Sequence, residues 1–256
     1  DETGAPSPLD PRNLLARIAQ RWRARGLTPV CALELEFYLH EPTTDTVTPP
    51  RRPDGAQLFA GDVYSLQDLD GFDDFLDDVY AACENFGIAV GQASSEVGCG
   101  QFELNFRHVA DPLRAADDAQ LFKYLVKGVA ARHGLGATFM AKPYGDQAGS
   151  GLHVHVSLVD DEGRNAFAGG TPAGSPLLRQ VIGGLIRDMP DAMLVFTPHF
   201  NSYRRMREGT HAPTQASWGL ENRTTAIRIP SGGDQDRRIE HRVAGADANP
   251  YLVLAT

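Results

Sequence analysis

One segment, residues 149–157 with the sequence GSGLHVHVS, constrains this chain more than any other. Its glycine-rich start predicts a turn, and the residues that follow predict a β-strand. His153 and His155 lie two positions apart, so their side chains project from the same face of that strand. A histidine pair of this kind in a strand is more often incidental than metal-binding. Its meaning therefore depends on what other segments place beside it.

Carboxylates occur with matching spacing in three other strand-like segments: Glu34 and Glu36, Glu96 and Glu103 around a turn at residues 98–100, and Glu240. Taken separately, they could be solvated acids on half-exposed strands or on the surface. Taken together, five carboxylates and two histidines in apolar or β-rich surroundings require an explanation. Carboxylates on an inner sheet face repel one another unless a cation lies between them. The set therefore predicts a divalent metal site.

The type of metal follows from the ligand atoms. Oxygen-rich sets with at most one imidazole suit Mg²⁺ or Mn²⁺, whereas zinc prefers more histidine or cysteine. Two such ions close together bind phosphoryl oxygens from two sides. The predicted site is therefore suited to phosphoryl transfer.

The three cysteines, Cys31, Cys83 and Cys99, are odd in number and have no CxxC spacing. This pattern argues against a disulfide scaffold or a zinc knuckle and indicates a reducing compartment, which favours a cytoplasmic protein. Cys99 could be a nucleophile, but its neighbours are acids that would not lower its pKa, so a structural thiol is favoured. No apolar run is long enough to span a bilayer, which predicts no membrane association.

The net charge of −9 argues against nucleic-acid binding, so an anionic substrate would require arginines gathered at one place. Candidates are Arg205, Arg223 and Arg228, with Arg238 and Arg242 on either side of Glu240. Guanidinium groups match the geometry of carboxylate and phosphate. Other arginines are interpreted as solvated surface residues; these are Arg204, Arg207 and Arg237.

Strands and helices alternate irregularly along the chain, which favours an antiparallel α+β domain over a regular βαβ fold. Residues 1–10 are interpreted as a linker, and residues 41–62 as a loop. Predicted helices cover residues 11–26, 70–87, 112–134 and 175–189, and a further helix begins at Asn249. Predicted strands cover residues 30–39 and 101–106, a hairpin at 137–158, and segments around Ala216, Ala226 and Ile239.

The set of motifs resembles the glutamine synthetase family. The motifs that carry the resemblance are, in chain order, residues 34–36, Glu96 with 100–103, 149–155, 201–205, 222–230 and 239–242. The resemblance runs from about Pro11 to the end, and residues 139–144, 213–219 and 243–250 resemble the γ-glutamylputrescine synthetase branch most closely. It implies one catalytic domain over residues 11–256, with a mainly antiparallel sheet lining the active site and helices packed outside.

The resemblance also implies roles for individual residues. One metal site would be formed by Glu36, Glu96 and Glu103, and a second by Glu34, His153 and Glu240. Nucleotide contacts would come from His155, Ser157, Arg228 and Arg238. Glutamate would be bound by Gly149, Arg205 and Arg242, and the transferred phosphoryl group by Arg223 and Arg228. The implied cofactors are two or more Mg²⁺ or Mn²⁺ ions, with ATP as co-substrate and glutamate and an amine as the other substrates.

Family members have a small β-grasp domain before the catalytic domain and a helical segment after it, and they assemble into homo-oligomeric double rings, or dodecamers. In these rings the preceding domain of one subunit completes the site of its neighbour. Neither segment is found in these 256 residues, and the helix from Asn249 has no stop signal. We therefore expect this segment alone to have little ligase activity.

The chain departs from glutamine synthetases at His211, where those enzymes place a flap glutamate that helps to bind ammonium. Loss of that negative charge predicts that an alkylamine or diamine is preferred to ammonia, with His211 near the amine. A role for His211 as a mere cap on the glutamate pocket stays open. The alternatives for the whole chain are a glutamine synthetase that uses ammonia and an inactive relative with a structural role. The intact metal ligands and arginines argue against the inactive relative.

Overall fold

The computed structural model describes residues 3–42 and 47–256. The helices are α1 (Pro11–Arg23), α2 (Leu66–Gly71), α3 (Asp73–Asn85), α4 (Pro112–Arg132), α5 (Pro176–Phe196) and α6 (Pro250–Ala255), with short 3₁₀ helices η1 (Ser202–Arg205) and η2 (Asp234–Asp236). The strands are β1 (Leu27–His40), β2 (Val90–Ser95), β3 (Gln101–Phe106), β4 (Gly136–Thr138), β5 (Leu152–Asp160), β6 (Trp218–Leu220), β7 (Ile227–Ile229) and β8 (Ile239–His241). Parts of the predicted linker (residues 1–2) and loop (43–46) lie outside the described residues.

Four helices begin in the same way, with a polar capping residue followed by proline. The pairs are Asp10-Pro11, Asp111-Pro112, Ser175-Pro176 and Asn249-Pro250. In each case the capping side chain accepts a hydrogen bond from a backbone N–H of the first turn, and proline lacks the N–H that would otherwise be unsatisfied there. These dipeptides explain why the predicted starts of α1, α4 and α6 are correct.

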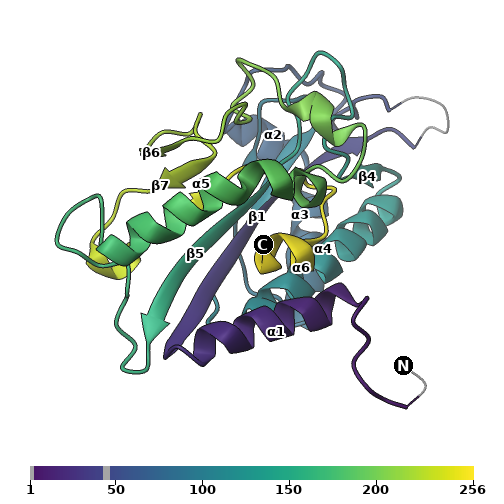
Figure 1. The fold of residues 1–256 in the computed structure, drawn as a ribbon. Coiled ribbons are helices and arrows are strands. Elements are labelled where there is room, and N and C mark those ends of the chain that lie inside the picture. Colours follow the sequence, from purple (N-terminus) through teal and green to yellow (C-terminus); the bar gives the residue numbers. More distant parts are fainter. Residues whose placement is uncertain (1–2, 43–46) are drawn as a thin grey trace.

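The strands form one mixed sheet in the order β2-β3-β1-β5-β8-β7-β6, and β4 pairs with the end of β1. Figure 1 shows the long strands β1 and β5 side by side. All pairs are antiparallel except β6 with β7. The long strand β1 lies at the centre, so its side chains reach both neighbouring strands that carry predicted ligands. The α+β class with a mainly antiparallel sheet is confirmed.

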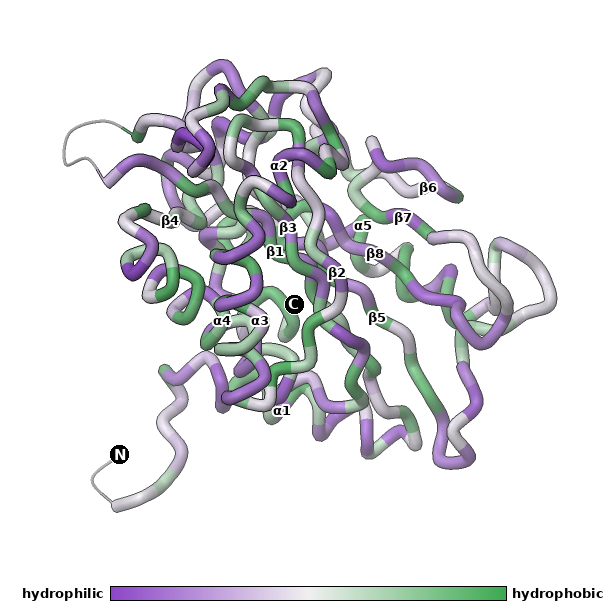
Figure 2. Tube along the Cα trace, turned by 180° about the vertical axis from the view of Figure 1, so that it is seen from behind, coloured by the Kyte–Doolittle hydropathy of each residue, from purple (hydrophilic) through white to green (hydrophobic). Residues whose placement is uncertain are grey.

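The hydrophobic core lies on one face of β1. Leu33, Leu35 and Phe37 are fully buried there. The Phe37 ring lies 5.5 Å from that of Phe139 and 6.2 Å from that of Phe122 on α4, and the tube view shows the hydrophobic strands behind α3 and α4 (Figure 2). Because side chains alternate along a strand, this burial turns Glu34 and Glu36 to the opposite face.

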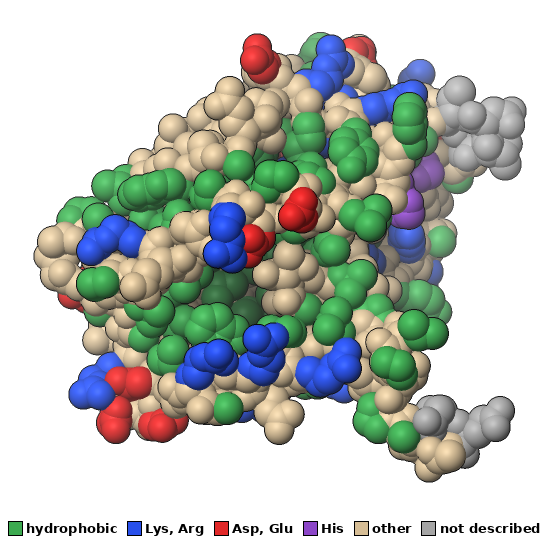
Figure 3. Space-filling view, in the orientation of Figure 1, with side chains coloured by type: hydrophobic (Ala, Val, Ile, Leu, Met, Phe, Trp, Pro, Cys, Tyr) green, Lys and Arg blue, Asp and Glu red, His purple; other side chains and the backbone are tan. Residues whose placement is uncertain are grey.

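A second apolar region lies between α1 and α5, where a hollow lined with hydrophobic side chains is visible on the surface (Figure 3). It is a cavity of about 390 Å³ lined by residues that include Trp22, Val181, Leu185 and Met189. Among the helices of the described residues, none combines the length and apolar character needed to cross a membrane.

Three sequence predictions about the elements are wrong. The segments at 137–158 do not form a hairpin, because β4 and β5 each pair with a different part of β1. The helix predicted at 70–87 is interrupted at Phe72, whose φ of −125° is not helical and whose ring packs against Phe102 at 5.4 Å. The helix predicted to end at Met189 continues to Phe196, with Pro190 inside it.

Candidate active site

Five of the six predicted metal ligands, together with His155, share the sheet face opposite the core. Glu34 is paired in register with His153, Glu36 with Glu103, and His155 with Glu240. Residues directly opposite one another in an antiparallel pair project from the same face, with Cβ atoms about 5 Å apart. The register of four strands therefore gathers these six side chains, although they come from positions far apart in the sequence.

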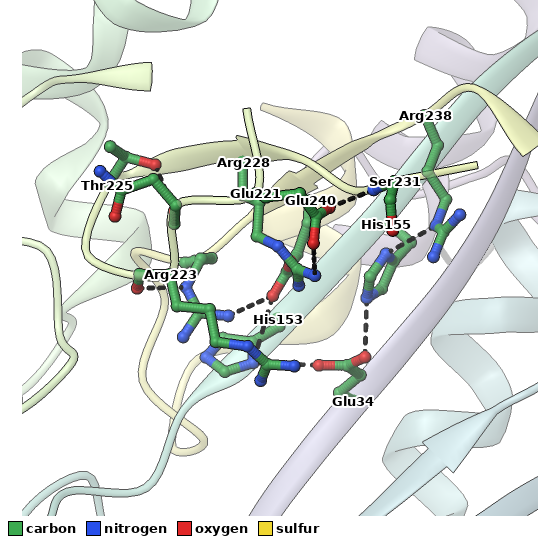
Figure 4. A network of polar contacts seen from close by, with 12 residues as sticks. Glu34, His153, His155, Glu221, Arg223, Thr225, Arg228, Ser231, Arg238 and Glu240 are labelled. Atoms are coloured by element: carbon green, nitrogen blue, oxygen red, sulfur yellow. Dashed lines mark hydrogen bonds and ion pairs between the residues drawn. The ribbon is translucent and has the colours of Figure 1, made fainter. Parts of the chain in front are cut away.

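The distances show how closely the ligand atoms approach. His153 Nδ1 lies 3.1 Å from Glu34 Oε2 and 3.9 Å from Glu240 Oε1, and His153 Nε2 lies 3.8 Å from Glu36 Oε1. His155 Nε2 lies 2.8 Å from Glu34 Oε1 (Figure 4). Two sets of ligand atoms lie within 4.8 Å of one another, namely Glu34 with Glu103 and His153, and Glu34 with His155 and Glu240.

Those sets overlap with the implied metal sites but differ from them in grouping, since His155 joins Glu34 and Glu240. The division of ligands between two ions stays a prediction. Glu96 follows β2 and accepts a hydrogen bond from Ser94 Oγ at 3.2 Å. It lies close enough to Glu36 for the charge of Glu36 to raise its pKa. All six predicted metal ligands thus belong to one cluster.

Two polar residues of the cluster escaped the sequence analysis. Gln101 Nε2 donates to Glu36 Oε2 at 3.2 Å and to the Gly149 carbonyl at 3.1 Å. With its amide nitrogen turned toward the carboxylates, Asn105 donates to Glu34 at 3.2 Å and to Glu103 at 3.3 Å. Both lie two positions from Glu103 on β3, so strand parity could have identified them.

The carboxylates repel one another, and the effect is visible in their pKa values. Burial, together with the charge of Glu36, raises the pKa of Glu96 to about 7. Burial raises the pKa of Glu103 well above its ordinary value, and the charges of Glu34 and Glu36 add to that effect. Burial also opposes ionisation of Glu34, but hydrogen bonds from His153 and His155 outweigh it and hold the Glu34 pKa below its usual range.

This donor set fits divalent metal ions. Carboxylate oxygens dominate the six predicted ligands, as Mg²⁺ and Mn²⁺ prefer, and His153 adds a single imidazole. A bound cation would also relieve the repulsion that raises the pKa values of Glu96 and Glu103. The six residues that would hold such ions are Glu34, Glu36, Glu96, Glu103, His153 and Glu240.

Arginines surround the cluster. Arg228 NH1 lies 2.6 Å from Glu240 Oε2, and Arg242 is paired with the other oxygen of the same carboxylate. Arg205 is only 4% exposed and donates to two backbone carbonyls, Val243 O at 2.9 Å and Arg242 O at 3.2 Å. A buried guanidinium without a carboxylate partner among the described residues is suited to binding an anionic ligand.

Gly149 and Gly151 lie so close to Arg205 that neither position has room for a side chain. A Cβ atom on Gly149 would lie 2.7 Å from Arg205 Cγ, and one on Gly151 would lie 2.7 Å from Arg205 NH2 and 2.8 Å from His153 Nε2. The glycine-rich start of the histidine segment therefore allows Arg205 to lie directly against the metal ligands.

The predicted nucleotide residues lie at the other side of the cluster. Arg238 Nε donates to His155 Nδ1 at 3.1 Å, so one imidazole joins Glu34 to an arginine. Ser157 lies two positions further along β5, on the same face as His155. His108 also lies here, with its ring 5.9 Å from that of His155, and the sequence analysis had not identified it.

One arginine differs from its predicted surroundings, and two predicted site residues lie on exposed loops. Arg237, interpreted as a solvated surface residue, is 5% exposed and donates to the Gly232 carbonyl at 3.0 Å, whereas Arg204 and Arg207 are exposed as predicted. Arg223 is exposed at the edge of the site, with its backbone carbonyl bound by Arg242 Nε. His211 lies on the exposed loop between η1 and β6 with φ of +56°. No hydrogen bond joins His211 to the cluster within the described residues, so its role stays a prediction.

An antiparallel sheet face with clustered carboxylates and histidines, surrounded by arginines, forms a candidate site for divalent metal ions and an anionic ligand. The chain matches the glutamine synthetase catalytic domain over residues 8–256 and belongs to this family. It is 46% identical over 259 residues to gamma-glutamylputrescine synthetase PuuA of Escherichia coli (strain K12), which covers 100% of this chain and 55% of that protein.

Two further comparisons agree. The chain is 35% identical over 257 residues to glutamate–isopropylamine ligase of Pseudomonas sp, covering 98% of this chain and 55% of the relative. A solved structure described as apo GmaS without ligand is similar at a TM-score of 0.86 and 33% identity, over 98% of this chain and 57% of that one. The chain thus spans about half the length of the curated relatives that it matches.

The cluster is expected to bind Mg²⁺ or Mn²⁺ directly. A crystal structure of the protein soaked in MgCl₂ should show density among the six ligands, with oxygen distances of about 2.0–2.1 Å. Soaking in MnCl₂ should place anomalous signal at the same positions. Well-ordered side chains with no metal density at millimolar concentrations would contradict the assignment.

Metal binding is also expected to depend on pH. Glu96 and Glu103 hold protons more tightly in the folded than in the unfolded protein, so their contribution to stability is lost as pH rises through their raised pKa values, about 7 for Glu96. Glu34 does not make the stability depend on pH between pH 6 and 8, because its lowered pKa leaves it ionised in the folded protein and it is also ionised in the unfolded protein. Mg²⁺ should therefore raise the melting temperature more at pH 8 than at pH 6. An equal increment at both values would contradict this expectation.

Proposed function

We propose that this protein is an ATP-dependent γ-glutamyl–amine ligase. The observation that carries the proposal is the cluster of six metal-ligand candidates bordered by Arg205, Arg228 and Arg242 in a member of the glutamine synthetase family. Bound divalent ions would offset the charge of the phosphate oxygens. The likeness to relatives named for ligation of glutamate or a γ-glutamyl group to amines supports an amine as the acceptor.

The residues divide between the three substrates. Arg205 and Arg242, with the backbone of Gly149, would bind glutamate. His155, Ser157, Arg228 and Arg238 would contact the nucleotide, and Arg223 and Arg228 would hold the phosphoryl group during its transfer. These assignments rest on the family resemblance, and the convergence of these side chains on one sheet face supports them.

The proposed reaction has two steps. An oxygen of the glutamate γ-carboxylate attacks the γ-phosphorus of ATP, and ADP leaves. The neutral amine nitrogen then attacks the carbonyl carbon of the resulting acyl phosphate, and inorganic phosphate leaves as the amide forms. Fixed guanidinium groups favour the first step because they meet developing negative charge without having to reorganise.

A cavity leads from the cluster toward α3 and supports a cationic second substrate. Glu34, Glu103 and Arg228 lie at its inner end, and Asp73 and Asp77 lie on its outer wall. These two aspartates are one helical turn apart and exposed, and neither forms an ion pair within residues 3–42 and 47–256. Negative charge at the entrance raises the local concentration of ammonium groups.

The same cavity also has apolar walls, against which an alkyl chain could pack, whereas ammonia has no alkyl group. Tyr64 and Leu66 are 60% and 74% exposed and line it together with Tyr80. Burial of an alkyl chain contributes about 0.8 kcal/mol per CH₂ group. His211 brings no fixed negative charge to hold ammonium, in line with the same preference.

The test is release of phosphate from ATP by the full-length protein with saturating glutamate and a panel of ammonia, butylamine and putrescine. We expect kcat/KM to increase in that order. Comparable or better efficiency with ammonia would assign the protein to the ammonia-using glutamine synthetases. Metal and nucleotide binding without turnover of any acceptor would favour an inactive family member.

A further inference from the structure

Glu221 lies immediately after β6 in a backbone conformation that glutamate rarely adopts. Its φ is +53°, in the left-handed region where non-glycine residues are strained. Strained residues of this kind persist where the surrounding structure holds them, and they gather at functional sites. The loop that Glu221 begins also contains Arg223, a residue of the candidate active site.

The backbone and side chain of Glu221 are both fixed by the segment that follows β7. Its N–H donates to the Ile229 carbonyl at 3.0 Å, and one carboxylate oxygen accepts from the backbone N–H of Ser231. The other oxygen, Oε2, lies 3.4 Å from Arg228 NH2. The carboxylate therefore joins the segment after β7 to the guanidinium of Arg228 (Figure 4).

Arg228 lies between two carboxylates that differ in their surroundings. Its NH1 contacts Glu240, whose side chain is 1% exposed, and its NH2 contacts Glu221, whose side chain is 50% exposed. Burial lowers the pKa of Arg228, but Glu240 and Glu221 outweigh that effect and raise it overall. The Arg228 side chain itself is 13% exposed, and its Nε is buried without a hydrogen-bond partner in the described part of the chain.

A single contact to Glu240 would leave the guanidinium plane able to turn about that bond. A second carboxylate on NH2 fixes the plane, because the guanidinium is rigid and its nitrogens point in set directions. The Glu221 contact is longer and more exposed than the Glu240 contact, so water screens its charge. It can therefore orient Arg228 while neutralising little of the positive charge that faces the cavity.

We propose that Glu221 is a positioning residue for phosphoryl transfer, which holds Arg228 in the orientation that meets the transferred group. The inference rests on the proposed function, since it assigns to Arg228 the phosphoryl contact described above. Glu221 acts through Arg228 and touches no substrate. The left-handed backbone at this position turns the carboxylate back toward β7, which an extended backbone would not do.

The test uses two variants of the full-length protein, Glu221→Gln and Glu221→Gly. Glutamine keeps the size and loses the charge, whereas glycine loses the side chain but suits a φ of +53°. We expect glutamate-dependent ADP formation to fall about tenfold or more in kcat for both variants, with KM for glutamate within about twofold of wild type. The melting temperature should be unchanged in Glu221→Gln and unchanged or higher in Glu221→Gly.

A matched control is Glu162→Gln, because Glu162 is also exposed and pairs with an arginine, Arg164, at 2.7 Å on a distant turn. It should retain wild-type kcat. Wild-type kcat in both Glu221 variants, or a fall in kcat that follows a fall in melting temperature in both, would overturn the positioning role. A wild-type protein without any glutamate-dependent ADP formation would instead overturn the proposed function, and the role of Glu221 with it.

Discussion

Replacing Glu36 with glutamine in the full-length protein is expected to lower glutamate-dependent phosphate release from ATP by about 10²–10³-fold. Glu36 lies on the cluster face of β1, 12% exposed, and accepts hydrogen bonds from the Gly151 N–H at 2.8 Å and from Gln101 at 3.2 Å. Glutamine can accept those bonds through its carbonyl oxygen but offers a metal ion no negative charge. The loss should therefore reflect metal binding and phosphoryl transfer rather than local misfolding.

The melting temperature distinguishes a loss of metal binding from local misfolding. The charge of Glu36 is among the causes that raise the pKa of both Glu96 and Glu103. Its removal lessens that repulsion, so the metal-free variant should melt at the same temperature as the wild type or higher. Glu41→Gln is the control, since Glu41 follows the same strand and accepts a peripheral bond from the Arg51 N–H at 3.1 Å. An active Glu36→Gln protein, or one that loses activity and stability together, would contradict the assignment.

The sheet face that holds the site could be predicted from the sequence because strand side chains alternate. Leu33, Leu35 and Phe37 are apolar, and their burial turns Glu34 and Glu36 to the other face. The same parity predicted that His153 and His155 project together. The order of the strands could not be predicted in this way. That β4 and β5 both pair with β1 depends on long-range packing, which local patterns do not report.

Contacts between loops could not be predicted from the sequence either. Arg237 was interpreted as a surface residue, yet it is buried and donates to the Gly232 carbonyl in the loop before η2. Glu221 has no alternating pattern to indicate its contact with Arg228, and its left-handed backbone is not visible in the residue type. The role of a residue that depends on how two loops meet can be identified only from the three-dimensional structure.

Replacing Glu240 with glutamine is expected to have an effect on stability opposite to that of Glu36→Gln. Glu240 is 1% exposed, and its carboxylate is shared by Arg228, at 2.6 Å, and Arg242. Removal of one partner from a buried ion pair leaves uncompensated charge and costs about 3–5 kcal/mol. The free energy of unfolding of the metal-free protein should therefore fall by about that amount, as measured by chemical denaturation.

The contrast between the two variants tests how the cluster is organised. Both remove one negative charge from the same set of metal-ligand candidates, and both should abolish most phosphoryl transfer. Glu240 forms direct ion pairs with Arg228 and Arg242, whereas the hydrogen-bond donors to Glu36 are uncharged, namely Gln101 and the Gly151 N–H. Equal changes in unfolding free energy for the two variants would show that Arg228 and Arg242 do not depend on Glu240. A lower stability for Glu240→Gln alone would show that this carboxylate serves the arginines as well as the metal ions.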